Sequence, residues 1–209
     1  MWPVQEQINK LVGVIGLEKN ITIEIVSDEN IGLCRDLCNE LMSFQQSKAV
    51  MAPESFNGMN FDTRMKSSYD SALRKQILVA KDGDEAVGYI FSTIDDITES
   101  ARTSIPVWAP TGKNYIGFYP YWLKLPQKIG CLSNLYIREA YKGSGLGSKL
   151  CDMAMKWLGS FPDCDLTFVY ISNGNDRAYD FYIRRGFVYS HEVFGGFITA
   201  AYYKHPKGK

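Results

Sequence analysis

A run of glycines in front of a helical pattern could bind a phosphate. Gly143, Gly145 and Gly147 alternate with other residues, and the stretch after them is apolar every three to four residues, which is typical of an amphipathic helix. The first turn of a helix presents free N–H groups at the positive end of its dipole. Glycine lets a ligand approach this backbone closely, so the segment is expected to bind phosphate.

Two common phosphate-binding motifs do not fit this glycine turn. A P-loop needs GxxxxGK followed by Ser or Thr, which is absent, and a dinucleotide fingerprint needs glycine where Ser148 stands. The turn also lies two thirds along the chain, whereas dinucleotide folds place it early. An enzyme that binds ATP or NAD here is therefore the least favoured alternative.

A second motif follows downstream: Asn175, Ala178, Phe181-Tyr182 and Gly186-Phe187. Together with Lys142-Gly143-Ser144-Gly145-Leu146-Gly147, it resembles the GNAT superfamily of acyl-CoA-dependent N-acyltransferases. The family's pyrophosphate motif begins with Arg or Gln, and Lys142 takes that place here. The close resemblance covers roughly residues 130 to 190.

The resemblance implies a fold for the whole chain. It implies an α/β (mixed α+β) architecture with residues 1–209 as one N-acetyltransferase domain. The central sheet is expected to be mostly antiparallel, with splayed middle strands and helices on both faces. The strand at 132–137 would diverge from the strand at 166–171.

The resemblance also implies acetyl-CoA as cofactor, with its pantetheine arm in the gap between those strands. Backbone groups of Leu135 and Ile137 would hold the arm, and the glycine turn would hold the diphosphate. The expected cofactor-binding residues are Leu135, Tyr136, Ile137, Lys142, Gly143, Ser144, Gly145, Leu146, Gly147, Ser148, Asn175 and Tyr182. Asn175 is also a good helix N-cap, and one side chain cannot readily do both.

Two residues are expected to be catalytic. A phenol stays protonated at neutral pH, so Tyr182 could protonate a departing thiolate. A peptide N–H near Asn134 or Leu135 could polarise the thioester carbonyl. The expected reaction moves acetyl to a primary amine of a small molecule or peptide by direct attack.

No general base is evident for the attacking amine. Water, Glu192, His191 or an acid from the N-terminal half are the alternatives. Cys131 as an acyl-accepting nucleophile is disfavoured because no histidine is near it in sequence. A CoA-binding module without acyl transfer is the competing function.

These residues need a sheet with interleaved helices to position them. Strands are expected at 21–25, 76–81, 86–93, 130–137 and 166–171 and near 187–191 and 197–203. Asp82-Gly83 predicts a hairpin turn. Helices are expected at 31–47, 61–75, 146–158 and 176–185.

Residues 95–129 interrupt this order and are interpreted as an insertion rich in proline and aromatic residues. The aromatic side chains could wall a substrate pocket, or the segment could bury a contact between two copies. Pocket wall and homodimer contact both stay open, and the acceptor amine is not identified.

The charge and hydropathy of the sequence limit the classes of partner that the protein is expected to bind. Lys plus Arg and Asp plus Glu are both 23, so no cationic surplus suits nucleic acid. Residues 1–129 carry a formal net charge of −3 and residues 130–209 one of +3, and the acids of the first part, with Asp95, Asp96 and Glu99 among them, would suit a cationic acceptor. The apolar run at 11–17 is too weak for a signal peptide, and no stretch reaches membrane-spanning length, so no membrane is expected.

The five cysteines are an odd number without a CxxC pair, which fits a reducing cytoplasm. His191 and His205 are the only histidines in the sequence, so no metal site is expected.

Overall fold

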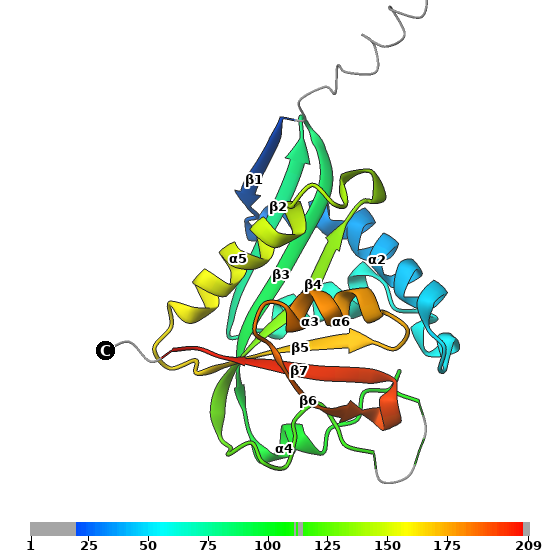
Figure 1. Cartoon of the computed structure of the whole chain (residues 1–209), viewed down its shortest axis with the longest axis vertical. Helices are drawn as coiled ribbons and strands as arrows, with labels where there is room; N and C mark the ends of the chain where they lie inside the picture. The colour runs from blue at the N-terminus through cyan, green and yellow to red at the C-terminus, as the bar shows by residue number, and fades with distance from the viewer. Residues whose placement is uncertain (1–19, 111, 113–114, 207–209) are drawn as a thin grey trace, which may run out of the picture.

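The computed structural model describes residues 20–110, 112 and 115–206. Its centre is a seven-stranded sheet with the order β1-β2-β3-β4-β5-β7-β6 (Figure 1). The strands are β1 Ile21–Ile25, β2 Arg74–Asp82, β3 Glu85–Ile97, β4 Gln127–Ile137, β5 Leu166–Ser172, β6 Val188–Val193 and β7 Ile198–Lys204. Every neighbouring pair is antiparallel except β4 and β5, which are parallel. The expected mixed, mostly antiparallel sheet is confirmed.

Helices cover both faces of this sheet. The α-helices are α2 Arg35–Lys48, α3 Ser67–Ser71, α4 Glu99–Arg102, α5 Leu146–Gly159 and α6 Asp176–Ile183. The short helical turns are η1 Asp28–Cys34, η2 Pro53–Phe56, η3 Phe61–Lys66, η4 Glu139–Tyr141 and η5 Phe194–Gly196.

The middle of the sheet is buried from both sides. Ile77 and Val79 pack in the cluster beneath α2 and η3, while Leu78 and Ala80 pack beneath α5. Alternate residues of a strand point to opposite faces, so a strand covered on both sides must be apolar throughout. This explains why β2 lacks the polar alternation of the edge strand β1.

Most elements lie where the sequence predicts them, and the differences are at their ends. The helix predicted from residue 31 begins as the 3-10 turn η1 and becomes α-helical only at Arg35. The helix predicted at 61–75 is a π-helical turn followed by α3, and it ends at Ser71 because β2 begins at Arg74. Tertiary pairing overrides local helical propensity at this boundary.

The segment predicted as an insertion is shorter than expected. β3 continues to Ile97, and its last residues pair with the beginning of β4, as in Ile97 opposite Gln127. The irregular part therefore runs from 98 to 126, with α4 inside it. The Asp82-Gly83 turn closes the β2–β3 hairpin as predicted, with Gly83 at φ 60°.

Among the described residues, no helix has both the length and the apolar composition needed to cross a bilayer. The apolar run at 11–17 lies outside the described residues. All five cysteines are free thiols. Within the described chain, no group of three or more His, Cys, Asp or Glu residues is arranged to hold a metal ion.

Candidate active site

The two middle strands separate at a bulge in β4. β4 and β5 pair in parallel from Ile129 opposite Leu166 to Leu132 opposite Val169, and their register ends there. On the other side of β4, Leu132 pairs with Ser92 and Asn134 with Phe91, so Ser133 is the extra residue of a bulge. A bulge bends its strand and re-aims the residues beyond it. The predicted splay of the middle strands is therefore present.

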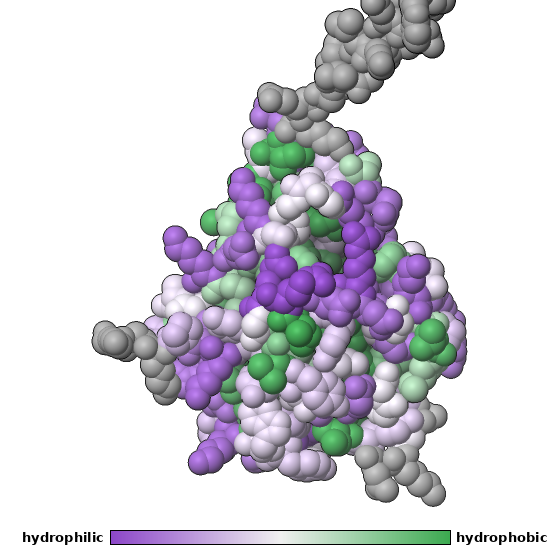
Figure 2. All heavy atoms as spheres, in the orientation of Figure 1, coloured by the Kyte–Doolittle hydropathy of each residue, from purple (hydrophilic) through white to green (hydrophobic). Residues whose placement is uncertain are grey.

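A groove of about 420 Å³ lies beside the diverging end of β4. Figure 2 shows this face hollowed near α6, with hydrophilic side chains around the opening. Ten of the twelve residues predicted to bind the cofactor line the groove: Leu135, Tyr136, Ile137, Lys142, Gly143, Gly145, Gly147, Ser148, Asn175 and Tyr182. Residues from β4, the glycine turn and α6 thus share one wall.

The glycine turn lines this groove next to the N-terminus of α5. Gly143 and Gly145 have φ angles of 78° and 84°, in the left-handed region that favours glycine. A Cβ at either position would meet no atom within 4 Å, so the backbone faces open space. The side chain of Ser144 instead turns to the carbonyl of Tyr141, 2.7 Å away, and Leu146 is buried in the core. These two are the predicted cofactor residues that do not line the groove, although their backbone belongs to the turn.

Cationic side chains surround the glycine turn. Lys142 lies with Nζ 2.6 Å from a carboxylate oxygen of Glu139 and 4.7 Å from the centroid of the Phe44 ring. Arg177 and Arg184 line the same groove. These two arginines were not identified from the sequence, because they occupy variable positions of the second motif. The net positive charge of residues 130–209 was the only sequence signal that pointed to them.

Tyr182 lies in the wall of the groove, almost fully buried. Its ring packs edge-on against Phe181 and Phe187, with centroids 5.1 and 5.4 Å away. Burial raises the pKa of the phenol well above its usual value of 10, and the nearby Cys151 thiol acts in the same direction. The hydroxyl therefore keeps its proton at neutral pH, as a proton donor must.

Asn175 caps α6. Its side-chain oxygen accepts from the backbone N–H of Ala178 at 3.4 Å, and the residue also lines the groove. The cap leaves the amide nitrogen of the side chain as the group that could reach a ligand.

A second, smaller cavity of about 40 Å³ begins where β4 bulges. Ser133 and Asn134 form its floor, together with Ser172 at the end of β5. The side chain of Asn134 is buried and donates to the phenolic oxygen of Tyr89 at 2.8 Å, which holds this part of the strand in place. Leu135 lines the groove and Asn134 lines the cavity, so the two hollows border consecutive residues of β4.

The segment between β3 and β4 forms part of this cavity wall. Trp108 and Phe118 line it, and both rings pack against Phe194 at 5.9 and 5.2 Å between centroids. Tyr121 and Trp122 of the same segment are exposed. One end of the segment thus contributes to a pocket, and another presents aromatic side chains to solvent.

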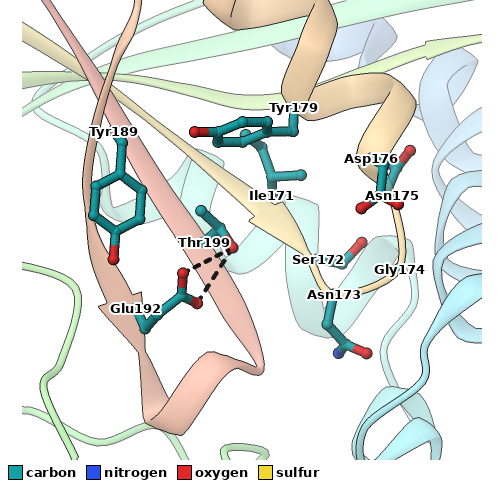
Figure 3. A pocket seen from close by; sticks show the side chains of 10 residues that line it. All are labelled: Ile171, Ser172, Asn173, Gly174, Asn175, Asp176, Tyr179, Tyr189, Glu192 and Thr199. Atoms are coloured by element: carbon teal, nitrogen blue, oxygen red, sulfur yellow. Dashed lines mark hydrogen bonds between the residues drawn. The ribbon is translucent and has the colours of Figure 1, made fainter.

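The candidate bases Glu192 and His191 both lie outside the wall of this cavity. Glu192 lines a separate hollow at the end of β5, where its carboxylate accepts from Thr199 Oγ1 at 3.3 Å (Figure 3). His191 is buried, with Nε2 2.8 Å from the carbonyl oxygen of Gly117. Burial raises the pKa of the Cys131 thiol to about 11, which disfavours it as a nucleophile.

Comparison with known proteins agrees with this geometry. The family model described as the acetyltransferase (GNAT) family matches residues 45–187. No curated protein matches the chain significantly.

Solved structures with the same fold are distant in sequence. The PaiA N-acetyltransferase of Thermoplasma acidophilum in complex with coenzyme A has a TM-score of 0.58 and 15% identity, covering 88% of this chain and 99% of that one. Arabidopsis thaliana Naa50 in complex with the bisubstrate analogue CoA-Ac-MVNAL has a TM-score of 0.53 and 15% identity, covering 88% and 98%. An acetyltransferase from Thermus thermophilus has a TM-score of 0.53 and 15% identity, covering 88% and 96%.

Proposed function

The chain belongs to the acetyltransferase (GNAT) family of acetyl-CoA-dependent acyltransferases, and we propose that it acetylates a primary amine of a small molecule or peptide. The observation that carries this proposal is that Asn134 and Leu135, consecutive residues of β4, line two different hollows. A thioester reaching the end of the groove and an amine in the cavity would come together at the bulge of β4. Relatives in complex with coenzyme A and with a CoA-peptide analogue support this arrangement.

The groove fits the coenzyme by its shape and by its charge. The open backbone at Gly143 and Gly145 lies at the positive end of the α5 dipole, where N–H groups can bind a diphosphate. Lys142, Arg177 and Arg184 add positive charge around the same opening. The side of β4 that faces β5 is without a strand partner beyond Leu132 in the described sheet, so its backbone groups can bind an amide-containing arm.

Acetyl-CoA supplies the activated acetyl group as a thioester. The backbone N–H near Asn134 polarises the carbonyl as the amine nitrogen bonds to the acetyl carbon and the carbon–sulfur bond breaks. The amine gives its proton to water, because no carboxylate or imidazole lines the described part of the cavity. Tyr182 protonates the departing thiolate and recovers a proton from solvent.

Thiol release in the presence of acetyl-CoA tests the proposal. The acceptors should include amino acids, polyamines, aminoglycosides and peptides, and calorimetry should measure coenzyme binding in parallel. We expect CoA to bind and at least one amine to accelerate thiol release. If CoA binds and every amine fails, the chain is a CoA-binding module instead of an enzyme.

A further inference from the structure

The cavity at the β4 bulge contains one charged side chain among its described lining residues, that of Arg64. Arg64 lies on the helical turn η3 and is half-buried. Its guanidinium donates from Nη1 to the hydroxyl of Ser68 at 3.2 Å, which holds it along the helix. Burial raises the pKa of the Cys131 thiol on β4, and the positive charge of Arg64 opposes that shift, so the charge is felt at the strand where the reaction would occur.

Arg64 differs from most arginines of this fold in having no carboxylate partner among the described residues. Arg35 pairs with Asp62, Arg74 with Asp163, Arg102 with Glu99 and Arg138 with Glu40, at distances from 2.5 to 2.9 Å. A half-buried guanidinium keeps several N–H donors that favour an anionic oxygen. The absence of a protein carboxylate leaves those donors for a ligand.

One side of the cavity wall is apolar. Two of its aromatic rings, Phe56 and Phe197, pack at 5.1 Å between centroids, and Trp108 lies 6.2 Å from Phe197. Met42 and Met59 complete this side of the cavity. Methionine and aromatic side chains form adaptable surfaces for an apolar group.

We propose that the acceptor is a small primary amine that carries both a carboxylate and an apolar side chain, the chemistry of a free hydrophobic α-amino acid. This inference rests on the proposed acetyl transfer. The carboxylate pairs with Arg64, the side chain lies among Phe56, Trp108 and Phe197, and the amine faces the bulge at Asn134. The nitrogen–carbon bond forms as the carbon–sulfur bond breaks, with the amine proton passing to water and the thiolate protonated by Tyr182.

The same charge disfavours a polycationic acceptor. A nearby cation lowers the pKa of an ammonium group, which favours the neutral, nucleophilic amine and opposes a second positive charge. The acids that suggested a cationic acceptor from sequence have partners elsewhere: Asp95 accepts from the backbone of Leu73, and Asp96 pairs with Lys128. Glu99 pairs with Arg102.

The test compares Arg64→Gln with the wild type on matched amines. Phenylalanine and methionine carry the carboxylate, phenethylamine lacks it, and spermidine represents polyamines. We expect Arg64→Gln to raise KM for the two amino acids by about 10- to 100-fold with little change in kcat. The ratio of the mutant KM to the wild-type KM should stay near one for phenethylamine. Arg64→Lys should restore part of the affinity for the two amino acids.

Two controls separate recognition from folding. Lys66→Gln changes an exposed cation two positions away on the same turn and should leave every KM unchanged. Melting temperature and CoA affinity should be the same in the wild type and Arg64→Gln. Calorimetric binding of phenylalanine to the CoA-bound protein provides a readout that does not require turnover.

The inference is overturned if Arg64→Gln affects phenylalanine and phenethylamine equally. It is also overturned if the wild type has a higher kcat/KM for spermidine, or for a peptide with N-terminal methionine, than for phenylalanine and methionine. Failure of every amine to release thiol contradicts the proposed acetyl transfer instead. In that case, phenylalanine binding that depends on Arg64 would still support a carboxylate-binding site. If phenylalanine does not bind, the carboxylate-binding site is also contradicted.

Discussion

The hydroxyl of Tyr170 donates to the backbone carbonyl of Phe118 at 2.9 Å. Tyr170 belongs to β5 beside the splay, and Phe118 belongs to the irregular segment that follows β3. Both line the cavity at the β4 bulge, and their rings pack edge-on at 5.0 Å between centroids. This hydrogen bond joins the long connection between β3 and β4 to β5.

Tyr170→Phe should loosen that wall. The variant leaves the Phe118 carbonyl without its donor, which we expect to cost about 1–3 kcal/mol of unfolding free energy. KM for the acceptor should rise severalfold while CoA affinity stays constant, because neither Tyr170 nor Phe118 lines the groove proposed for the coenzyme. Steady-state kinetics and urea unfolding measure both effects. Tyr121→Phe, at an exposed position of the same segment, is the control. Equal changes of KM and of unfolding free energy in the two variants would contradict the role assigned to the Tyr170 hydroxyl.

Tyr182→Phe should reduce kcat and spare coenzyme binding. The ring contacts with Phe181 and Phe187 remain, whereas the proton for the departing thiolate is lost. General acid catalysis contributes on the order of 10² to 10⁴ in rate, so a loss in that range is expected. Thiol release measures kcat, and calorimetry measures the Kd of CoA.

Tyr179→Phe removes another hydroxyl from the same helix and serves as the control. Its side chain lines the separate hollow near Glu192 (Figure 3). Because burial raises the pKa of Tyr182 above 10, its ionisation should not produce a fall in kcat below that pH. Unchanged turnover in Tyr182→Phe would exclude it as the proton donor.

Gly145→Ala should weaken CoA binding more than it weakens the fold. A φ of 84° costs a non-glycine residue roughly 1–2 kcal/mol, and the new methyl group would enter the groove. Gly83→Ala is a matched control because Gly83 also has a positive φ of 60° and open space around a Cβ, but lies in the β2–β3 turn. Both variants should unfold at lower denaturant concentration, and only Gly145→Ala should raise the Kd of CoA. Equal Kd values would mean that the turn does not bind the coenzyme.

His191 should make stability fall on mild acidification. Burial lowers its pKa from the ordinary 6.5, although the carbonyl of Gly117 and the charge of Glu192 oppose the shift. The unfolded chain then takes up a proton before the folded one does, so the free energy of unfolding decreases as pH falls below about 6.5. His205, whose pKa is also lowered by burial, adds a contribution of the same sign.

Urea unfolding at several pH values between about 7 and 5 measures this dependence. His191→Gln should give a flatter slope than the wild type, and His205→Gln should flatten it by a separate amount. The exposed carboxylates Asp62 and Asp163 have lowered pKa values, because each accepts hydrogen bonds from an arginine, so they titrate below this window. A slope unchanged in both histidine variants would show that neither imidazole is responsible.

The groove proposed for the coenzyme could be predicted from the sequence because the features that form it are local. Gly143 and Gly145 shape a turn within a few residues, and Asn175 and Tyr182 lie within one short helix and its cap. Such spacings are constrained by helix geometry and by positive φ angles, and both leave a signature in consecutive residues. The order of strands and helices could be read for the same reason.

The cavity proposed for the acceptor depends on tertiary structure alone. Arg64, Trp108, Ser133 and Phe197 come from four distant segments, and no spacing connects them. The bulge at Ser133 is equally invisible, because the β4 run around it shows no periodicity that would reveal one extra residue. Local periods specify which elements form, whereas the packing of those elements on the sheet determines which side chains meet across it.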